Sequence, residues 1–324
     1  MELMDKYRFQ NTFTRIPFVM RFSKLFYVVF LLTGMQCRSP YNIDIGDQNV
    51  LYQVSAYVVP SKPILFYVSK VGQPVGEADY QLKDTAKIYF TNGSNEYLIE
   101  PKYFPNQLNP VYQLSNWNAT SDESEIKVIF NSGQQLSSKV SIPKDSISCS
   151  IDYTETSFID NAVQSVKLQM HWPDQTQTFH YYHLIIKKVD WNYDGQGGYK
   201  SEGLSNVEIA PSDSRNLKGV TLLSHEPGLL LTDALLMENN MNLDLLVKTL
   251  GPISRNKERF KELQIELRTV SEEYYKFHKS VALQLSSSQS GFPVLEPIRT
   301  YTNIIGGQGI FASYRSTFST KLIQ

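Results

Sequence analysis

One acidic segment has the residue types and spacing of a calcium-binding loop. Asp190, Asn192 and Asp194 in the sequence DWNYDG match the oxygen ligands that open an EF-hand loop, and the glycine of its sharp bend follows directly. Such a loop closes with a bidentate glutamate at its twelfth position, which Ser201 occupies here. Because that carboxylate is missing, we favour an acidic loop between strands, and the three residues stay a weak metal candidate.

The histidines and Cys149 form no recognisable catalytic motif. His180 and His183 are three residues apart in an expected strand, so their side chains point to opposite faces. His225 and Glu226 lack the second histidine of the HExxH zinc motif, and no GxSxG nucleophile elbow occurs. Carboxylate pairs for glycoside hydrolysis depend on three-dimensional separation and stay open. We therefore expect no enzyme activity and no cofactor, with a carbohydrate-active envelope hydrolase as the alternative.

Cys37 follows a segment with the layout of a secretory signal. Arg21 and Lys24 precede an apolar run at 25–35, and the chain turns polar after Cys37. A basic start, an apolar run of about 7–15 residues and a processing site define such a signal. We predict that residues 1–36 are removed and that Cys37 becomes the acylated first residue, as in bacterial lipoproteins.

The start of this signal and its cleavage leave alternatives. Met20 is a possible true start, because residues 20–37 form a compact signal by themselves. An ordinary signal peptide with an unmodified cysteine would have the same layout. An uncleaved anchor is disfavoured, because a membrane span needs about 20 apolar residues and Lys24 interrupts the run. Residues 37–49 would then be a lipidated tether.

The composition of the chain argues against a nucleic acid partner and, if Cys37 is acylated, against an intramolecular disulfide. The chain carries 31 Lys and Arg against 32 Asp and Glu, for a net charge of −1. Nucleic acid binding needs a concentrated basic surface, so we expect no nucleic acid partner. The chain has two cysteines, and acylation of Cys37 would leave Cys149 without a disulfide partner. The 20 tyrosines and 17 phenylalanines suit half-buried strand surfaces.

Short strands separated by turns fill the first half of the mature chain. We expect strands at 50–59, 63–70, 85–90, 95–101, 124–130 and 135–143. Asn92-Gly93 and residues 131–133 are tight-turn signals between them. Strands at this spacing without a helical period predict a mainly β fold, with an immunoglobulin-like β-sandwich at 50–145.

The second half, residues 146–324, is expected to be a β-rich domain with one helix. Predicted strands lie at 163–172, 179–189, 243–250 and 262–270, and a Gly-rich loop occupies 190–206. The helix is predicted at about 271–285, because Ser271 can cap it and apolar residues recur at helical spacing.

The C-terminal sequence resembles a known lipoprotein family. SEEYYKFHKSVALQ (271–284) and FPVLEPIRTYTNIIGGQGIFASY (292–314) are similar to the signature of a Bacteroidota family, domain of unknown function 4249. The matching positions of the second stretch are Glu296, Pro297, Tyr301, Asn303, Ile304, Gly307, Gly309, Ile310, Phe311 and Tyr314.

The resemblance implies an outer-membrane lipoprotein without an established activity, often encoded beside TonB-dependent receptors. We therefore expect an envelope protein that is held at the outer membrane by its lipid and works as an accessory or binding component of such a receptor. A surface adhesion or structural lipoprotein is a further alternative. Periplasmic and surface placement both stay open, because Arg38-Ser39-Pro40 follow the cysteine instead of acidic residues.

Two further sets of residues are candidates for modification and binding. Thr85 and Ser146 stand in Asp-Thr-Ala and Asp-Ser-Ile sequences, which resemble the O-glycosylation signal of Bacteroidota. Trp191, Tyr193 and Tyr199 lie in the expected loop 190–206, where aromatic side chains are typical of interface anchors. The alternative is that these rings cover the domain's own core.

Overall fold

The structure is a computed structural model in which residues 49–324 form one compact unit. It describes residues 51–71, 85–103, 109–144, 146–159, 163–173, 180–193, 196, 199–211, 220–222, 226–233, 242–249, 262–289 and 299–323. The predicted signal at 1–36, Cys37 and the tether at 37–49 lie outside the described residues. No helix in the described part is both long and apolar enough for a membrane span.

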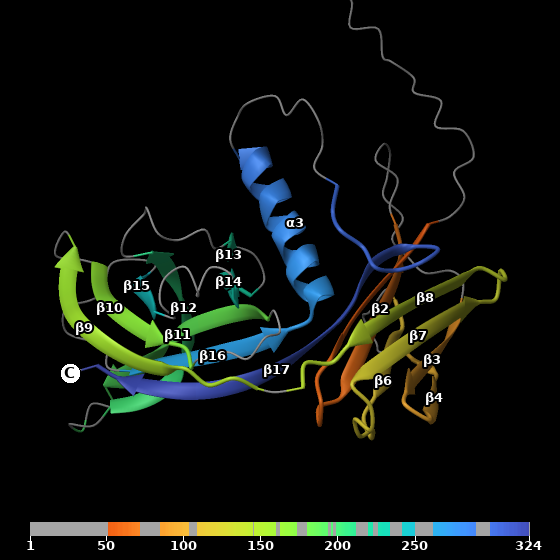
Figure 1. Cartoon of the computed structure of the whole chain (residues 1–324), viewed down its shortest axis with the longest axis horizontal. Helices are drawn as coiled ribbons and strands as arrows, with labels where there is room; N and C mark the ends of the chain where they lie inside the picture. Colours follow the sequence, from red (N-terminus) through yellow and green to blue (C-terminus); the bar gives the residue numbers. More distant parts are fainter. Residues whose placement is uncertain are drawn as a thin grey trace, which may run out of the picture. The chain divides into compact units, whose positions relative to one another are not determined.

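The described part of the chain is built almost entirely of strands (Figure 1). The first half contains β1 (Tyr52–Val58), β2 (Ile64–Lys70), β3 (Ala86–Asn92), β4 (Asn95–Ile99), β5 (Pro101–Lys102), β6 (Val111–Leu114), β7 (Glu123–Phe130) and β8 (Gln135–Ser141). The second half contains β9 (Ser150–Ile159), β10 (Val163–His171), β11 (Tyr181–Tyr193), β12 (Tyr199–Pro211), β13 (Val220–Leu222), β14 (Gly228–Thr232), β15 (Asn242–Thr249), β16 (Glu262–Val270) and β17 (Gln308–Leu322). The helix α3 (Glu272–Gln289) follows β16.

The described strands form two sheets. The larger has 13 strands, with the order β5-β6-β2-β1-β17-β16-β11-β12-β15-β10-β9 and with β14 and β13 attached beside β11. The smaller has four strands in the order β4-β3-β7-β8. Among the described pairs only β1 and β17 run parallel, in a register from Gln53 opposite Gln308 to Val58 opposite Ser313.

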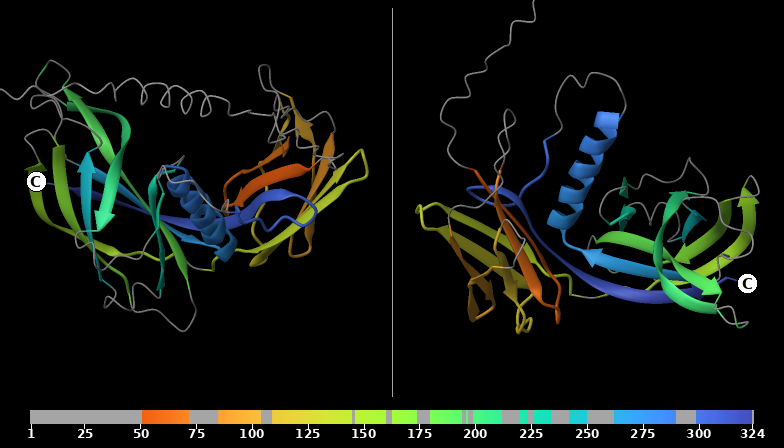
Figure 2. Two further views of the ribbon diagram at one scale, coloured as in Figure 1. Left: turned by 90° about the horizontal axis from the view of Figure 1, so that it is seen from above. Right: turned by 180° about the vertical axis from the view of Figure 1, so that it is seen from behind.

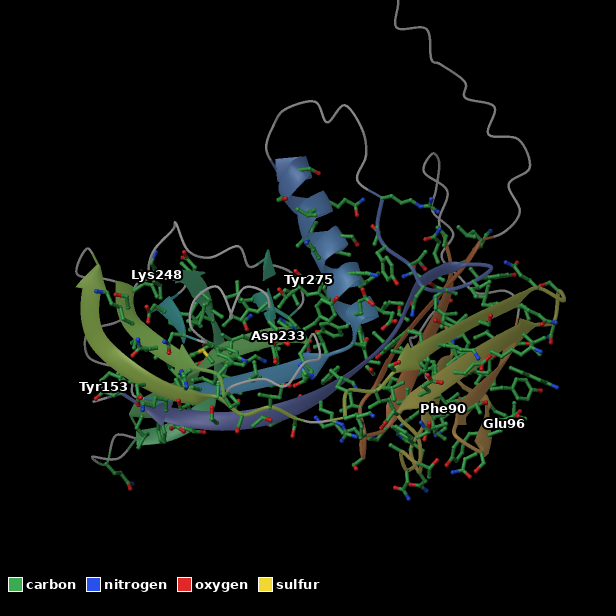
Figure 3. The ribbon with its side chains drawn as sticks, viewed as in Figure 1. Phe90, Glu96, Tyr153, Asp233, Lys248 and Tyr275 are labelled. Carbon is green, nitrogen blue, oxygen red and sulfur yellow. The ribbon has the colours of Figure 1, made fainter. Side chains whose placement is uncertain are left out.

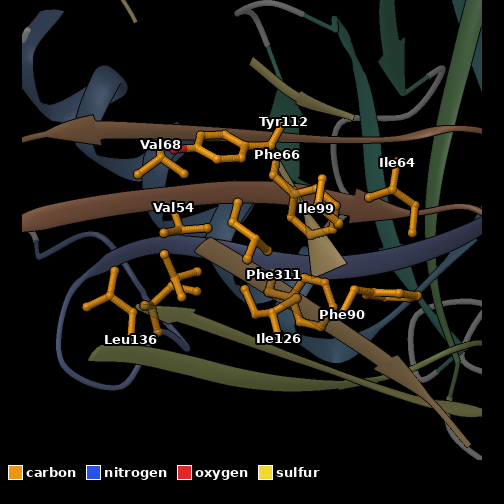
Figure 4. Close-up of a cluster of buried hydrophobic side chains, with 14 of the residues drawn as sticks. Val54, Ile64, Phe66, Val68, Phe90, Ile99, Tyr112, Ile126, Leu136 and Phe311 are labelled. Carbon is orange, nitrogen blue, oxygen red and sulfur yellow. The ribbon is translucent and has the colours of Figure 1, made fainter. Parts of the chain in front are cut away.

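The first hydrophobic core lies between the four-stranded sheet and the β1-β2-β6 end of the large sheet (Figure 4). Alternate residues of each strand point into it, as the buried positions of β3 and β7 show. Phe90 is fully buried and meets the rings of Phe66, Trp117 and Phe311 edge-on. Because Phe311 comes from β17, the C-terminal strand completes a core that is otherwise built by the N-terminal half.

The second core lies on the other half of the large sheet, along which the long strand β17 curves (Figure 2). Leu263, Ile265 and Leu267 of β16 point into it, as their alternation with polar neighbours predicts. Trp172 and Tyr182 are fully buried there. A third, smaller cluster packs α3 against the opposite face of the sheet.

β17 belongs to both halves of the described chain. Its first residues pair with β1, and residues from Tyr314 to Leu322 pair with β16. A mainly β fold with one helix near the C-terminus is therefore confirmed. The division into separate domains at residue 145 stays a prediction.

Most predicted strands are confirmed, and the helix is confirmed four residues longer than expected at its C-terminal end. The prediction of a loop at 190–206 is wrong, because 190–193 extend β11 and 199–206 begin β12. Polar residues and glycines concealed this hairpin, since they weaken the apolar alternation that marks a strand.

Candidate functional site

A row of polar side chains crosses three neighbouring strands beneath α3. His183 of β11 lies opposite Arg268 of β16, and Arg268 lies opposite Ser316 of β17. Residues directly opposite one another in a sheet project from the same face, so the three side chains share the face that α3 covers. His183 and Arg268 are buried, although strand alternation alone would leave this face to solvent.

The start of α3 is fixed by a serine and places a tyrosine over this row. The Ser271 hydroxyl oxygen accepts the backbone N–H of Tyr274, as an N-cap residue does, and also that of Ser313. Tyr274 is 1% exposed and its hydroxyl reaches both His183 and Arg268. The N-cap predicted at Ser271 is thus confirmed, and it joins the helix to β17.

Arg268 uses its whole guanidinium group within this cluster. Nε and Nη2 donate to the carboxylate of Glu266, at 2.7 and 3.3 Å. Nη1 and Nη2 donate to Glu226, and Nη1 also donates to the Tyr274 hydroxyl at 3.3 Å. The Tyr314 ring lies 4.5 Å from Cζ, a cation–π distance. A guanidinium has five N–H donors, so Arg268 keeps none for a ligand.

The proton on His183 is fixed by its neighbours. Burial raises the pKa of Tyr274, so its hydroxyl keeps a proton, and Arg268 can only donate to its oxygen. We infer that Tyr274 donates to His183 Nδ1, which lies 2.8 Å away. Burial, followed by the charges of Arg268 and His278, lowers the pKa of His183 well below its usual value. His183 is therefore neutral.

Further aromatic residues enclose the cluster. Tyr57 of β1 is 3.1 Å from His278 Nε2 through its hydroxyl, and its ring meets that of Tyr274 edge-on. The Tyr274 and His278 rings lie 4.2 Å apart. Burial raises the pKa of Tyr57, with Glu226 and Tyr314 acting in the same direction. These rings enclose His183 and Arg268, so the centre of the cluster is buried, and His183 Nε2 has no hydrogen-bond partner there.

A pocket opens beside this network, at the edge of β17 that has no paired strand among the described residues after Ser313. It has a volume of about 160 Å³ and is lined by Val59, Pro60, Lys62, Ser146, Arg315, Ser316 and Phe318. Ser316 connects it to the buried row, because its hydroxyl donates to Glu266 at 2.6 Å. Arg315 donates from Nε to the carbonyl oxygen of Pro143, which fixes the guanidinium at one wall.

A second buried carboxylate lies in the curved half of the large sheet (Figure 3). Asp233 is 1% exposed, and its Oδ2 accepts the backbone N–H of His180 at 2.6 Å and lies 3.0 Å from its Nδ1. Burial and the nearby Asp233 raise the pKa of Tyr182. His180 and His183 thus serve different clusters on opposite faces, as the sequence predicts.

Two of the three predicted metal candidates, Asp190 and Asn192, lie in a strand rather than in a turn. Asp190 pairs with Lys188 Nζ at 2.9 Å and accepts a hydrogen bond from the Ser205 hydroxyl. The backbone of Asn192 pairs with Lys200 in the hairpin, and Asp194 lies outside the described residues. Within the described ranges, no three His, Cys, Asp or Glu side chains are grouped as metal ligands.

The predicted partner residues occupy the end of the β11–β12 hairpin. The backbones of Tyr193 and Tyr199 pair at its tip, and Trp191 pairs with Ser201 next to a register shift. Trp191 is half-buried, and its indole N–H is buried without a hydrogen-bond partner.

The two predicted glycosylation residues are both exposed. Thr85 accepts a hydrogen bond from the Asn131 side chain just before β3, and Ser146 lies at the rim of the pocket. Cys149 packs partly buried against the second core, where burial raises the pKa of its thiol to about 11.

Sequence reasoning missed the Arg268 cluster and the pocket. The alternation in β16 does place Glu266 and Arg268 on one face. Nothing in it indicates that α3 folds back over that face, or that Glu226 reaches Arg268 from 42 residues away.

Comparison with known proteins gives one family. Residues 38–320 match the family model described as a domain of unknown function, DUF4249. No curated protein matches the chain.

Proposed function

Because the chain belongs to the DUF4249 family, we propose that it is a non-enzymatic, lipid-anchored envelope protein that docks onto a TonB-dependent outer-membrane transporter. The anchor is Cys37, and the membrane is the outer membrane. The partner follows from the family resemblance. The docking element follows from the β11–β12 hairpin.

The observation that carries the proposal is a two-stranded ribbon within the segment 189–206, formed by residues 189–193 and 199–204. β11 pairs with β16 only as far as Lys188, and β12 pairs with β15 only from Val207 onward. Among the described residues, 189–193 and 199–204 therefore pair only with one another. A ribbon whose outer edges pair with no other described strand offers backbone N–H and C=O groups to a partner strand, a common mode of peptide recognition.

The side chains of the ribbon fit an interface. Leu204 is 47% exposed on it, and Trp191 lies half-buried on the facing strand. Tryptophan is enriched among the residues that dominate binding energy. The enclosure of His183 and Arg268 supports a binding role over a catalytic one, because a reacting group must reach its substrate.

We also infer that β1–β8 form an immunoglobulin-like sandwich. The orders β5-β6-β2-β1 and β4-β3-β7-β8 correspond to strands D-E-B-A and C′-C-F-G of that fold. β17 then adds to the A strand in parallel, which explains why its residues complete the sandwich core.

The test is an affinity pull-down from native outer membranes. Wild-type protein should recover a TonB-dependent receptor, and a Trp191→Ala, Tyr193→Ala double variant should recover much less. The matched control is Leu98→Ala, Tyr103→Ala, which removes two exposed residues of 50% and 67% exposure from the sandwich. Equal recovery by both variants would exclude the ribbon, and recovery of no receptor by wild type would exclude the partner.

The anchor has its own test in the same cells. Two acyl chains hold a protein stably at a membrane, and a single chain holds it only marginally. Cys37→Ser should therefore move the protein from the membrane pellet to the soluble fraction. Retention of the variant in the pellet would show that another part of the chain makes the attachment.

A further inference from the structure

The geometry points to the pocket at the edge of β17 as a binding site for a phosphate monoester. This site is separate from the ribbon within 189–206 and does not depend on the proposed partner. We identify the class of ligand from the positive charge and the hydrogen-bond donors of the residues that line the pocket.

Two structural elements fix the backbone of Lys62 and the side chain of Arg315 beside the pocket. Lys62 ends a tight turn in which its N–H donates to the Val59 carbonyl oxygen at 3.1 Å, and Ser61 has a positive φ of 64°. Trp117 donates from its indole N–H to the Lys62 carbonyl oxygen at 2.7 Å. Arg315 is fixed in β17 and by its bond to the Pro143 carbonyl oxygen.

The donors that remain can surround an oxyanion. Nε of Arg315 is used, which leaves the two Nη groups for a ligand. The Ser316 hydroxyl gives its hydrogen to Glu266 and can only accept. The Lys62 ammonium and the Ser146 hydroxyl complete the set of donors on the pocket wall.

The charge of the lining selects the ligand. Lys62 and Arg315 bring two positive charges, and no Asp or Glu is among the described residues that line the pocket. Glu266, which Ser316 contacts, shares the Arg268 guanidinium with Glu226, so these three groups keep a net charge of −1 against the two positive charges of the pocket. Arginine and lysine together suit a doubly charged phosphate, because a guanidinium binds two of its oxygens at once.

The remaining walls suit the carbon atoms of an ester. Phe318 is 56% exposed beside the pocket, with its ring 5.9 Å from Lys62 Nζ, and Val59 and Pro60 add apolar surface. The volume of about 160 Å³ exceeds many times the 10–15 Å³ or so that one water needs, so a phosphate with its first attached carbons fits.

The experiment uses the full chain with Cys37→Ser, made in a host that leaves Ser146 unmodified. Glycerol 3-phosphate and inorganic phosphate are titrated by calorimetry. Both should bind saturably, and Lys62→Gln or Arg315→Gln should each weaken binding by about tenfold or more, as expected for a lost charge-assisted hydrogen bond. The control is Lys321→Gln, which removes a basic residue from the same strand outside the pocket.

Several outcomes would overturn the proposal. These are no saturable binding of either phosphate, unchanged affinity in Lys62→Gln, or acetate binding as tightly as phosphate. Lys62→Gln decides if Arg315→Gln misfolds, because Lys62 is an exposed side chain.

Flotation with phosphatidylcholine vesicles, with and without phosphatidic acid, then identifies the source of the phosphate. Flotation that depends on both phosphatidic acid and Lys62 supports a lipid headgroup. Calorimetric binding without flotation supports a soluble phosphate ester.

Discussion

At the scale of single residues, Arg268 contacts the carboxylates of Glu226 and Glu266, the hydroxyl of Tyr274 and the aromatic ring of Tyr314. Its side chain is 7% exposed, and Glu266 is 15% exposed. Removing one partner of a buried ion pair leaves the other charge without compensation, which costs far more than an exposed pair contributes. The packing of α3 on the sheet therefore depends strongly on the Arg268 side chain.

Arg268→Ala should lower the free energy of unfolding by roughly 3–5 kcal/mol, because it leaves Glu266 buried and unpaired. The control is Lys276→Ala, which breaks an exposed pair with Glu272 four residues earlier and should cost about 0.3–0.5 kcal/mol. Urea unfolding followed by circular dichroism measures both. Similar losses in the two variants would mean that the buried cluster contributes no more than a surface pair.

His183 predicts the pH dependence of stability. Its pKa is lowered in the folded protein by burial and by Arg268 and His278, and in the unfolded chain it is about 6.5. Below that pH the unfolded chain binds a proton that the folded protein does not, so acidification destabilises the fold. The slope due to this residue reaches at most ~1.4 kcal/mol per pH unit.

The free energy of unfolding, measured from pH 7.5 down to pH 5, should therefore fall less steeply in His183→Gln than in the wild type. His171→Gln is the matched control, because His171 is exposed and its Nδ1 lies 2.9 Å from the side-chain oxygen of Asn242. Identical slopes in His183→Gln and the wild type would contradict the assignment of a neutral, buried imidazole.

The sequence predicts the local elements of this site, but it does not predict that they come together in space. Alternation in β16 and the cap at Ser271 are local signals, and both are confirmed. The burial of Arg268 arises from a helix that folds back, and Glu226 is brought to it through β14 and β11. Such contacts between distant residues leave no periodicity in the sequence.

At the scale of elements, β17 enters the sheet through a glycine that no other residue can replace. Gly309 has a φ of +108° and lies opposite Val54 of β1. A Cβ at this position would lie 2.0 Å from the Val54 carbonyl oxygen. This close approach of Gly309 to β1 is seen only in the fold.

Three glycine-to-alanine variants separate the causes of this requirement. Gly203→Ala should be nearly neutral, because Gly203 lies in a strand with open space around it. Gly133→Ala should cost about 1–2 kcal/mol, because its φ is +90° but nothing lies within 4 Å. Gly309→Ala adds a clash with backbone and should cost the most. Thermal unfolding of the three proteins gives the order, and a Gly309→Ala loss no larger than that of Gly133→Ala would contradict the clash.

Physical causes explain why the sequence pattern does not reveal some of the strands. The first part of β12 is rich in polar residues and contains Gly203, because it lies in a ribbon that extends beyond the neighbouring strands β15 and β16. β6 has only four residues, too few for an alternating pattern to stand out. The confirmed strands β1, β3, β7 and β16 each have one buried face, and that burial is what alternation records.

At the scale of the whole molecule, one strand couples two hydrophobic cores. Phe311 of β17 packs in the sandwich core, and β17 then pairs with β16 along the second core. Each core contains one buried tryptophan, Trp117 at 6% and Trp172 at 0% exposure. If the shared strand makes the molecule cooperative, both cores should unfold together.

Two reporter proteins test this coupling by fluorescence during urea unfolding. One retains Trp117 through Trp172→Phe, Trp191→Phe, and the other retains Trp172 through Trp117→Phe, Trp191→Phe. Because each set of substitutions changes stability by itself, the decisive quantity is the shift caused by adding Gly309→Ala to each. A cooperative molecule transmits the damage at the β1–β17 junction to both cores, so both midpoints should fall by a similar amount. A fall confined to the Trp117 reporter would mean that the halves on either side of residue 145 unfold independently. β17 would then be a strand that the sandwich can lose while β16 and the second core remain folded.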